Sequence, residues 1–173
     1  YTASFSSFFI FYLIERFQLS VFDAQVQLFI FMTSIAVGTL IGGPLTDRIG
    51  RQPMIWISIL GALPFTLALP YAGPFWTSVL TVIIGLLMAS AFPAILVYAQ
   101  ELVPGRVGLI AGMFFGFAFG LAGIGAAVMG RIADATSVGF VFQLCAHLPA
   151  IGLVTWLLPD LERLRSKASS FPA

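Results

Sequence analysis

Three charged side chains, Asp47, Arg48 and Arg51, lie close together in the chain, with one glycine before them at position 43 and another between the two arginines at position 50. A carboxylate in such a turn can interact with the positive N-terminus of a neighbouring helix, and arginines can form ion pairs with other carboxylates. We expect Gly43 to permit a close approach at a helix end, and Gly50 to adopt a backbone conformation that other residues resist. The spacing therefore favours a charged turn built for specific contacts.

A carboxylate that the arginines of this turn can reach is Glu101, which ends a later apolar stretch and is followed by Arg106. A few such contacts are enough to bias an equilibrium between two states that differ by a few kcal/mol. We therefore predict a conformational gate, and its expected members are Gly43, Asp47, Arg48, Gly50, Arg51, Glu101 and Arg106. The alternative is a positively charged membrane anchor without a gating role.

Neutral polar side chains within or just beyond the apolar stretches are candidates for the wall of a substrate cavity. They are Ser7, Tyr12, Gln25, Gln27, Ser90, Tyr98 and Gln100. Each can instead form a hydrogen bond with a neighbouring helix. The chain has neither a histidine cluster, nor a cysteine pair with metal spacing, nor a phosphate-binding loop, so we expect no catalytic residues, no metal and no cofactor, and no enzyme activity.

The composition places these residues in a membrane. Hydrophobic residues make up 60% of the chain and charged residues 9%, with a mean hydropathy of +1.04, whereas soluble domains have about 25% charged residues. We expect an all-α integral membrane protein with spans at residues 1–14, 21–43, 53–69, 75–97, 107–129 and 138–158. The first span is shorter than the others, and we expect that its start is truncated.

The distribution of positive charge predicts the orientation of these spans. Six of the eight lysines and arginines fall on the side of the Asp47 turn, the Glu101 loop and the C-terminal segment. The positive-inside rule then places these segments in the cytoplasm. A further bundle that precedes this one in the same polypeptide is compatible with that orientation.

An internal repeat organises the spans. Gly38, Gly43 and Asp47 reappear 87 positions later as Gly125, Gly130 and Asp134. Because an odd number of spans separates the copies, we predict two inverted three-helix repeats. The expected boundaries are 1–69 for the first repeat, 70–74 for an extracytoplasmic loop, 75–158 for the second repeat and 159–173 for a cytoplasmic tail.

Glycines follow one face of the fifth span at a spacing of four residues. They are Gly108, Gly112, Gly116 and Gly120. Small residues in such a row let two membrane helices approach closely. The row predicts either static helix packing or a surface along which helices slide during gating.

The Asp47 turn resembles the signature loop of the major facilitator superfamily, which joins the second and third helices of each six-helix half. The match departs at Gln52–Pro53, where the signature often continues with basic residues. Segments 82–85, 89–92, 94–106 and 114–120 resemble the C-terminal half of bacterial fosmidomycin resistance transporters. The resemblance implies proton-coupled drug efflux in the bacterial inner membrane.

It also implies the partners, which are the lipid bilayer, an N-terminal six-helix half, a small-molecule substrate and protons; we expect no nucleic acid. Two alternatives stay open. One is a superfamily carrier for a sugar or another metabolite, and the other is a structural or channel-forming six-helix membrane protein. The repeated Asp47 and Asp134 turns favour a transporter over a scaffold.

Overall fold

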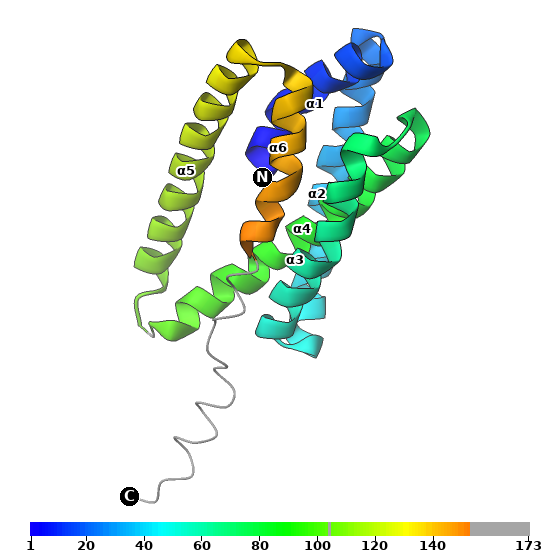
Figure 1. Ribbon diagram of the computed structural model, residues 1–173. Helices are drawn as coiled ribbons and strands as arrows, with labels where there is room; N and C mark the ends of the chain where they lie inside the picture. Colours follow the sequence, from blue (N-terminus) through cyan, green and yellow to red (C-terminus); the bar gives the residue numbers. More distant parts are fainter. Residues whose placement is uncertain (104, 153–173) are drawn as a thin grey trace, which may run out of the picture.

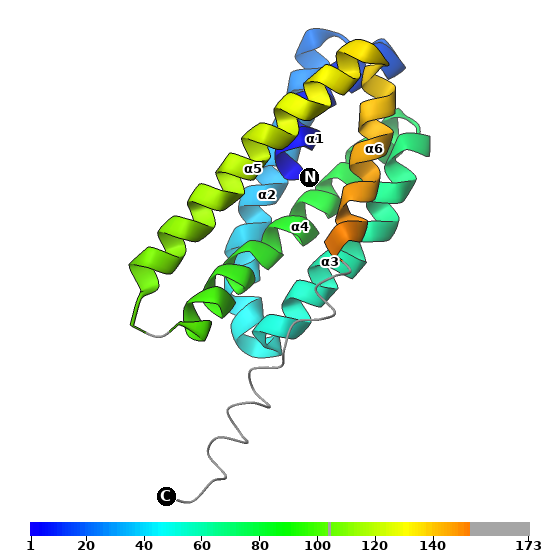
Figure 2. The ribbon, with the colours of Figure 1, turned by 60° about the vertical axis from the view of Figure 1, so that its left-hand side comes forward.

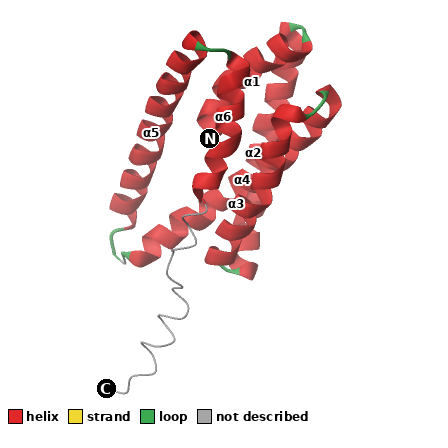
Figure 3. Cartoon of the chain, in the orientation of Figure 1, coloured by secondary structure: helices red, strands yellow, loops and turns green. Residues whose placement is uncertain are grey.

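The computed structural model describes residues 1–103 and 105–152, and these residues form helices and short connections without a β-strand. The helices are α1 (Thr2–Phe17), α2 (Val21–Ile49), α3 (Arg51–Ala68), the 3-10 helix η1 (Leu69–Tyr71), α4 (Pro74–Leu102), α5 (Val107–Ala135) and α6 (Val138–Ile151). The helical content is evident in Figure 3. The predicted all-α class is confirmed for this part of the chain.

The helices run alternately up and down, so that connections gather at the two ends of the bundle (Figure 1). The α2–α3 and α4–α5 connections lie at the lower end in this view, and the other connections lie at the upper end. The Asp47 turn and the Glu101 end of α4 therefore share one end. Asp134, near the end of α5, lies at the opposite end, as expected for inverted copies, although the repeat symmetry stays a prediction.

Within residues 1–103 and 105–152, four helices are long and apolar enough to cross a membrane: α2, α3 together with η1, α4 and α5. Helix α6 is a shorter apolar helix in the described residues. The predicted remainder of the sixth span and the predicted cytoplasmic tail at 159–173 lie outside the described residues. The structure thus supports membrane insertion, while a count of six spans stays a prediction.

Local sequence explains where two of the helices begin. The Ser20 hydroxyl accepts a hydrogen bond from the backbone N–H of Asp23 at 3.1 Å and donates to its carboxylate at 2.7 Å, which caps the start of α2. Gly50 alone separates α2 from α3 and has φ of 98°, a conformation that glycine adopts readily. The prediction that Gly50 adopts a backbone conformation that other residues resist is confirmed.

An aromatic core joins α1, α2 and α6. Phe5, Phe9, Phe31 and Phe142 are at most 2% exposed, and Tyr12 stacks on Phe142 with ring centroids 3.8 Å apart. Phe5 also lies 4.7 Å from Phe31 and 5.1 Å from Phe142 between ring centroids. This cluster holds the short helix α1 against the longer helices.

The second half of the core lies between α2, α3 and α4. Helix α2 makes its most extensive contacts with α4, and α3 also packs along α4. Helix α5, by contrast, has no buried residue and lies on the outside of the bundle in both views (Figure 1 and Figure 2). The described chain is therefore tightly packed around α4 and loosely packed around α5.

Candidate functional site

The Asp47 turn, which we define as residues 43–51, is a tight corner between two helices. Residues 43–49 form the last turns of α2, Gly50 reverses the chain, and Arg51 is the first residue of α3. The backbone N–H of Gly50 donates to the Thr46 carbonyl at 2.9 Å and closes the last turn of α2. The corner fixes where the charged side chains leave the backbone.

One ion pair connects this corner to α4. Arg51 Nη2 lies 2.9 Å from Glu101 Oε1, and the two side chains are 36% and 23% exposed. A pair with this exposure is accessible to water and is a weak contact that a conformational change can break at low cost. The structure confirms that Glu101 pairs with an arginine of the turn, and this arginine is Arg51.

The other charges of the predicted gate are free at the surface. Asp47, Arg48 and Arg106 are exposed, and none of them forms an ion pair within residues 1–103 and 105–152. They remain available for a partner that is not in this chain segment.

The close approach to a neighbouring helix that was expected at Gly43 is made by Gly42. A Cβ at Gly43 would meet nothing within 4 Å, whereas a Cβ at Gly42 would lie 2.6 Å from Ser90 Cα and 2.7 Å from Ser90 O. One residue turns a helix by about 100°, so adjacent glycines point in different directions. The expectation for Gly43 is wrong within the described residues, and Gly42 takes that role.

Similar close contacts occur at two further points of the α2–α4 interface. A Cβ at Gly38 would lie 2.8 Å from Leu86 Cα, and a Cβ at Gly85 would collide with the Ser34 hydroxyl. The signal was present in the sequence, because Ser34, Gly38, Gly42 and Thr46 repeat every four residues in the second span. Small residues at this spacing predict a packed helix pair.

The glycine row on α5 has no such neighbour. A Cβ at Gly108, Gly112, Gly116 or Gly120 would meet nothing within 4 Å. The described residues therefore contain no packing partner for the row, and its packing role stays a prediction about protein outside this segment.

The seven polar cavity candidates do not converge on a single site in the described chain. Ser7 and Gln25 are exposed, while Gln27 and Gln100 are half-buried. Tyr12 is 4% exposed within the aromatic core, and Tyr98 is 5% exposed. Ser90, which is 7% exposed, points towards α3 and bonds to Ser58. Ser58 was missed, because a single serine in an apolar run carries no distinctive sequence signal.

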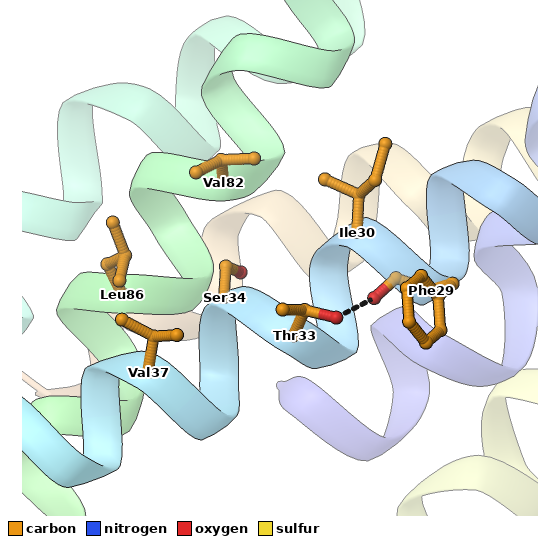
Figure 4. Close-up of a pocket in the computed structure, with 7 residues that line it drawn as sticks. All are labelled: Phe29, Ile30, Thr33, Ser34, Val37, Val82 and Leu86. Carbon is orange, nitrogen blue, oxygen red and sulfur yellow. Dashed lines mark hydrogen bonds between the residues drawn. The ribbon is translucent and has the colours of Figure 1, made fainter.

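An apolar pocket does lie between α2 and α4, and none of the seven candidates lines it (Figure 4). Its volume is about 320 Å³. Its walls are Phe29, Ile30, Thr33, Ser34, Val37, Val82 and Leu86. The Thr33 hydroxyl donates to the Phe29 carbonyl at 2.8 Å, so this hydroxyl is already satisfied within its own helix.

A family model described as the Major Facilitator Superfamily matches residues 1–173. The apolar helices, the charged corner and this match together show that the chain belongs to the major facilitator superfamily, whose members are transporters and not enzymes.

The chain is 60% identical over 160 residues to the fosmidomycin resistance protein of Escherichia coli (strain K12), an alignment that covers 92% of this chain. It is 39% identical over 159 residues to an uncharacterized MFS-type transporter of Bacillus subtilis (strain 168), again with 92% of this chain covered. The chain spans 39% of the length of each of these two relatives.

A gallate transporter of Pseudomonas putida is 30% identical over 137 residues, which cover 76% of this chain and 30% of that protein. No solved structure is significantly similar to the chain.

Proposed function

We propose that the chain is the C-terminal half of a proton-coupled exporter of fosmidomycin or a similar small anionic drug. In this proposal an N-terminal six-helix half supplies the other wall of the cavity, and the protein works by alternating access in the bacterial inner membrane. The C-terminus lies in the cytoplasm, in keeping with the excess of lysine and arginine on that side.

The observation that carries the proposal is the 60% identity to a fosmidomycin resistance protein across 92% of this chain. An alignment of 160 residues in a chain of 173 must include the Asp47 turn and the α4 helix. It therefore covers both the corner with the Arg51–Glu101 ion pair and the helix that the corner contacts.

The gate in this proposal is the end of the bundle that carries the Asp47 turn. The Arg51–Glu101 pair joins α3 to α4 within this half. The exposed Asp47, Arg48 and Arg106 then contact the other half when that end closes. Each contact that forms when this end closes contributes about 1 kcal/mol, and a few such contacts are enough to shift the equilibrium between the closed and open states.

The chemistry of the substrate requires a contribution from the other half. Fosmidomycin is an anionic phosphonate, and the arginines of the described residues stand at or near helix ends rather than at the centre of a span. A cation that binds the phosphonate within the membrane then comes from the N-terminal half. This half supplies neutral polar groups, of which Ser7 and Gln25 are the exposed examples.

The second candidate is a carrier for a sugar or another metabolite. It is favoured by the 30% identity to a gallate transporter. Because that identity is half the value for the fosmidomycin resistance protein, we rank metabolite transport second.

The test is a growth assay in a fosmidomycin-sensitive bacterium that expresses the full-length parent protein. We expect the parent to raise the inhibitory concentration of fosmidomycin, and we expect the Asp47→Asn variant at equal membrane abundance to lose this effect. Unchanged drug sensitivity, in cells shown to hold the inserted parent protein, would direct the search to metabolites.

A further inference from the structure

Two serine hydroxyls meet deep within the interface between α3 and α4. Ser58 is 0% exposed and Ser90 is 7% exposed, and their oxygens are 2.8 Å apart. The Ser90 hydroxyl donates its single hydrogen to the Leu87 carbonyl at 2.7 Å. Ser58 is therefore the donor in the pair, and Ser90 both accepts and donates.

This pair differs from other buried hydroxyls of the same two helices. Thr66 in α3 donates to the Leu63 carbonyl at 2.9 Å, and Thr81 in α4 donates to the Thr77 carbonyl at 2.6 Å. Those bonds stay within one helix and cannot fix a helix against its neighbour. The Ser58–Ser90 bond crosses between helices and does so where water is not available to replace it.

A third helix reaches the same point. The backbone of α2 at Gly42 comes so close to Ser90 that an added Cβ would lie 2.6 Å from Ser90 Cα. Ser90 thus lies where α2, α3 and α4 meet. A shift of α3 along α4 at this point must break the hydroxyl bond, because α2 leaves Ser90 no room to follow.

The register of α3 on α4 is uniform along this interface. A Cβ at Gly61 would lie 3.7 Å from Leu87 Cδ1, and Ser58 bonds to Ser90. Nearer the start of α3, Met54 and Ile55 pack with Ala94. In an antiparallel pair with this register, Arg51 stands about one turn, or about 6 Å, short of Glu101. Its long side chain leans towards the start of its helix and covers that offset.

We propose that Ser58 and Ser90 are positioning residues for the Asp47 turn: their hydrogen bond holds α3 in register with α4 and so keeps Arg51 within reach of Glu101. A slip of α3 by one helical turn away from the Glu101 end of α4 moves Arg51 about 5.4 Å further from Glu101 and breaks the ion pair. The inference rests on the proposed gate, but the register is measured without any transport.

The experiment uses the full-length parent with spin labels on cysteines at Ile57 and Leu102, which are 48% and 49% exposed, in a background that includes Cys145→Ser. Pulsed electron paramagnetic resonance measures the distance between the labels in lipid vesicles. Interhelical hydrogen bonds in membranes shift equilibria about threefold on average. We therefore expect Ser58→Ala and Ser90→Ala each to raise the ratio of a displaced to the native distance population about threefold.

Matched controls remove a hydroxyl that bonds within its own helix. Thr66→Val and Thr81→Val are expected to leave the distance distribution unchanged. The Ser58→Ala/Ser90→Ala double variant is expected to match either single variant, because both changes remove one shared bond. Distributions unchanged in both alanine variants, or changed equally in the threonine controls, would overturn the inference.

A second measurement asks whether the serine bond holds the register without help from the ion pair. In a Glu101→Gln background, which lacks the charge that holds Arg51, we expect Ser58→Ala to raise the displaced population by the same factor as in the parent, because the two contacts contribute separately to the register. Loss of the effect in that background would show that the serine bond does not set the register and would overturn the inference. If the proposed drug transport fails while these distances respond as expected, the positioning inference stands and only the proposed function falls.

Discussion

At the scale of single residues, the structure separates the charges of the Asp47 turn into two groups. Arg51 is used within the chain, where it pairs with Glu101 at 2.9 Å. Asp47 and Arg48 are exposed and point to no ionic partner in the described segment. The two groups predict different consequences of substitution.

Glu101→Gln is expected to shift the conformational balance of the parent and to weaken transport. Exposed ion pairs contribute about 0.2 to 1 kcal/mol, so the shift is at most about fivefold. The measurement is the rate at which single cysteines at each membrane face react with a thiol reagent. Unchanged transport together with unchanged accessibility on both faces would exclude a gating role for this pair.

Tyr12 tests whether a predicted cavity residue acts instead in packing. Its ring stacks on Phe142 at 3.8 Å with an interplanar angle of 6°. We expect Tyr12→Phe to retain transport and stability because it keeps the ring. Tyr12→Ala is expected to lower the free energy of unfolding by about 3 to 5 kcal/mol, as measured by thermal unfolding in detergent. A loss of transport in Tyr12→Phe, with normal stability, would restore the hydroxyl as a substrate contact.

At the scale of helices, the described chain divides by how closely its elements pack. The α2–α4 interface places backbone against backbone at Gly38 and Gly42, whereas α5 has no buried residue. Close packing of this kind lacks the free space that a sliding interface needs. We therefore expect α2 and α4 to move as one unit.

Two adjacent glycines provide a matched test of that packing. Gly42→Ala adds a methyl group 2.6 Å from Ser90 Cα, while Gly43→Ala adds one with nothing within 4 Å. Overpacking costs about 1 to 3 kcal/mol, so Gly42→Ala is expected to lower the unfolding temperature of the parent. Gly43→Ala serves as the control for helix propensity. Equal unfolding temperatures for the two variants would contradict the packing described for α2 and α4.

At the scale of the whole molecule, two observations bear on what packs against the glycine row of α5. The chain spans 39% of the length of its relatives, and the glycine row of α5 meets nothing in the described residues. We propose that the other half of the protein packs on this row.

Gly112→Leu tests that proposal. In the full-length parent the larger side chain is expected to overpack the contact and lower the free energy of unfolding by about 1 to 3 kcal/mol. Leu109→Met, a substitution of similar volume on the exposed surface of the same helix, is the control. Unaltered stability in Gly112→Leu would place this face against lipid.

The sequence predicted the all-α membrane class, the special backbone at Gly50 and the pairing of Glu101 with an arginine. Each prediction has a direct signal in the sequence: hydropathy indicates spans, glycine permits a positive φ, and opposite charges favour an ion pair. It did not predict that Gly42 rather than Gly43 makes the close contact. A one-residue change rotates a side chain by about 100°, and only the packing partner decides which direction is inside. The role of Tyr12 and Ser90 is ambiguous in the sequence for the same reason, since a polar group in a span can face either a cavity or another helix.

The most direct test of proton-coupled drug export is uptake of labelled fosmidomycin into inverted membrane vesicles that contain the full-length parent, with and without a proton gradient. We expect uptake that requires the gradient and is lost in Asp47→Asn, although that variant inserts normally. Uptake that continues without the gradient would contradict proton coupling. Normal uptake in Asp47→Asn would contradict the gate. No uptake by intact protein would refute drug export as the function.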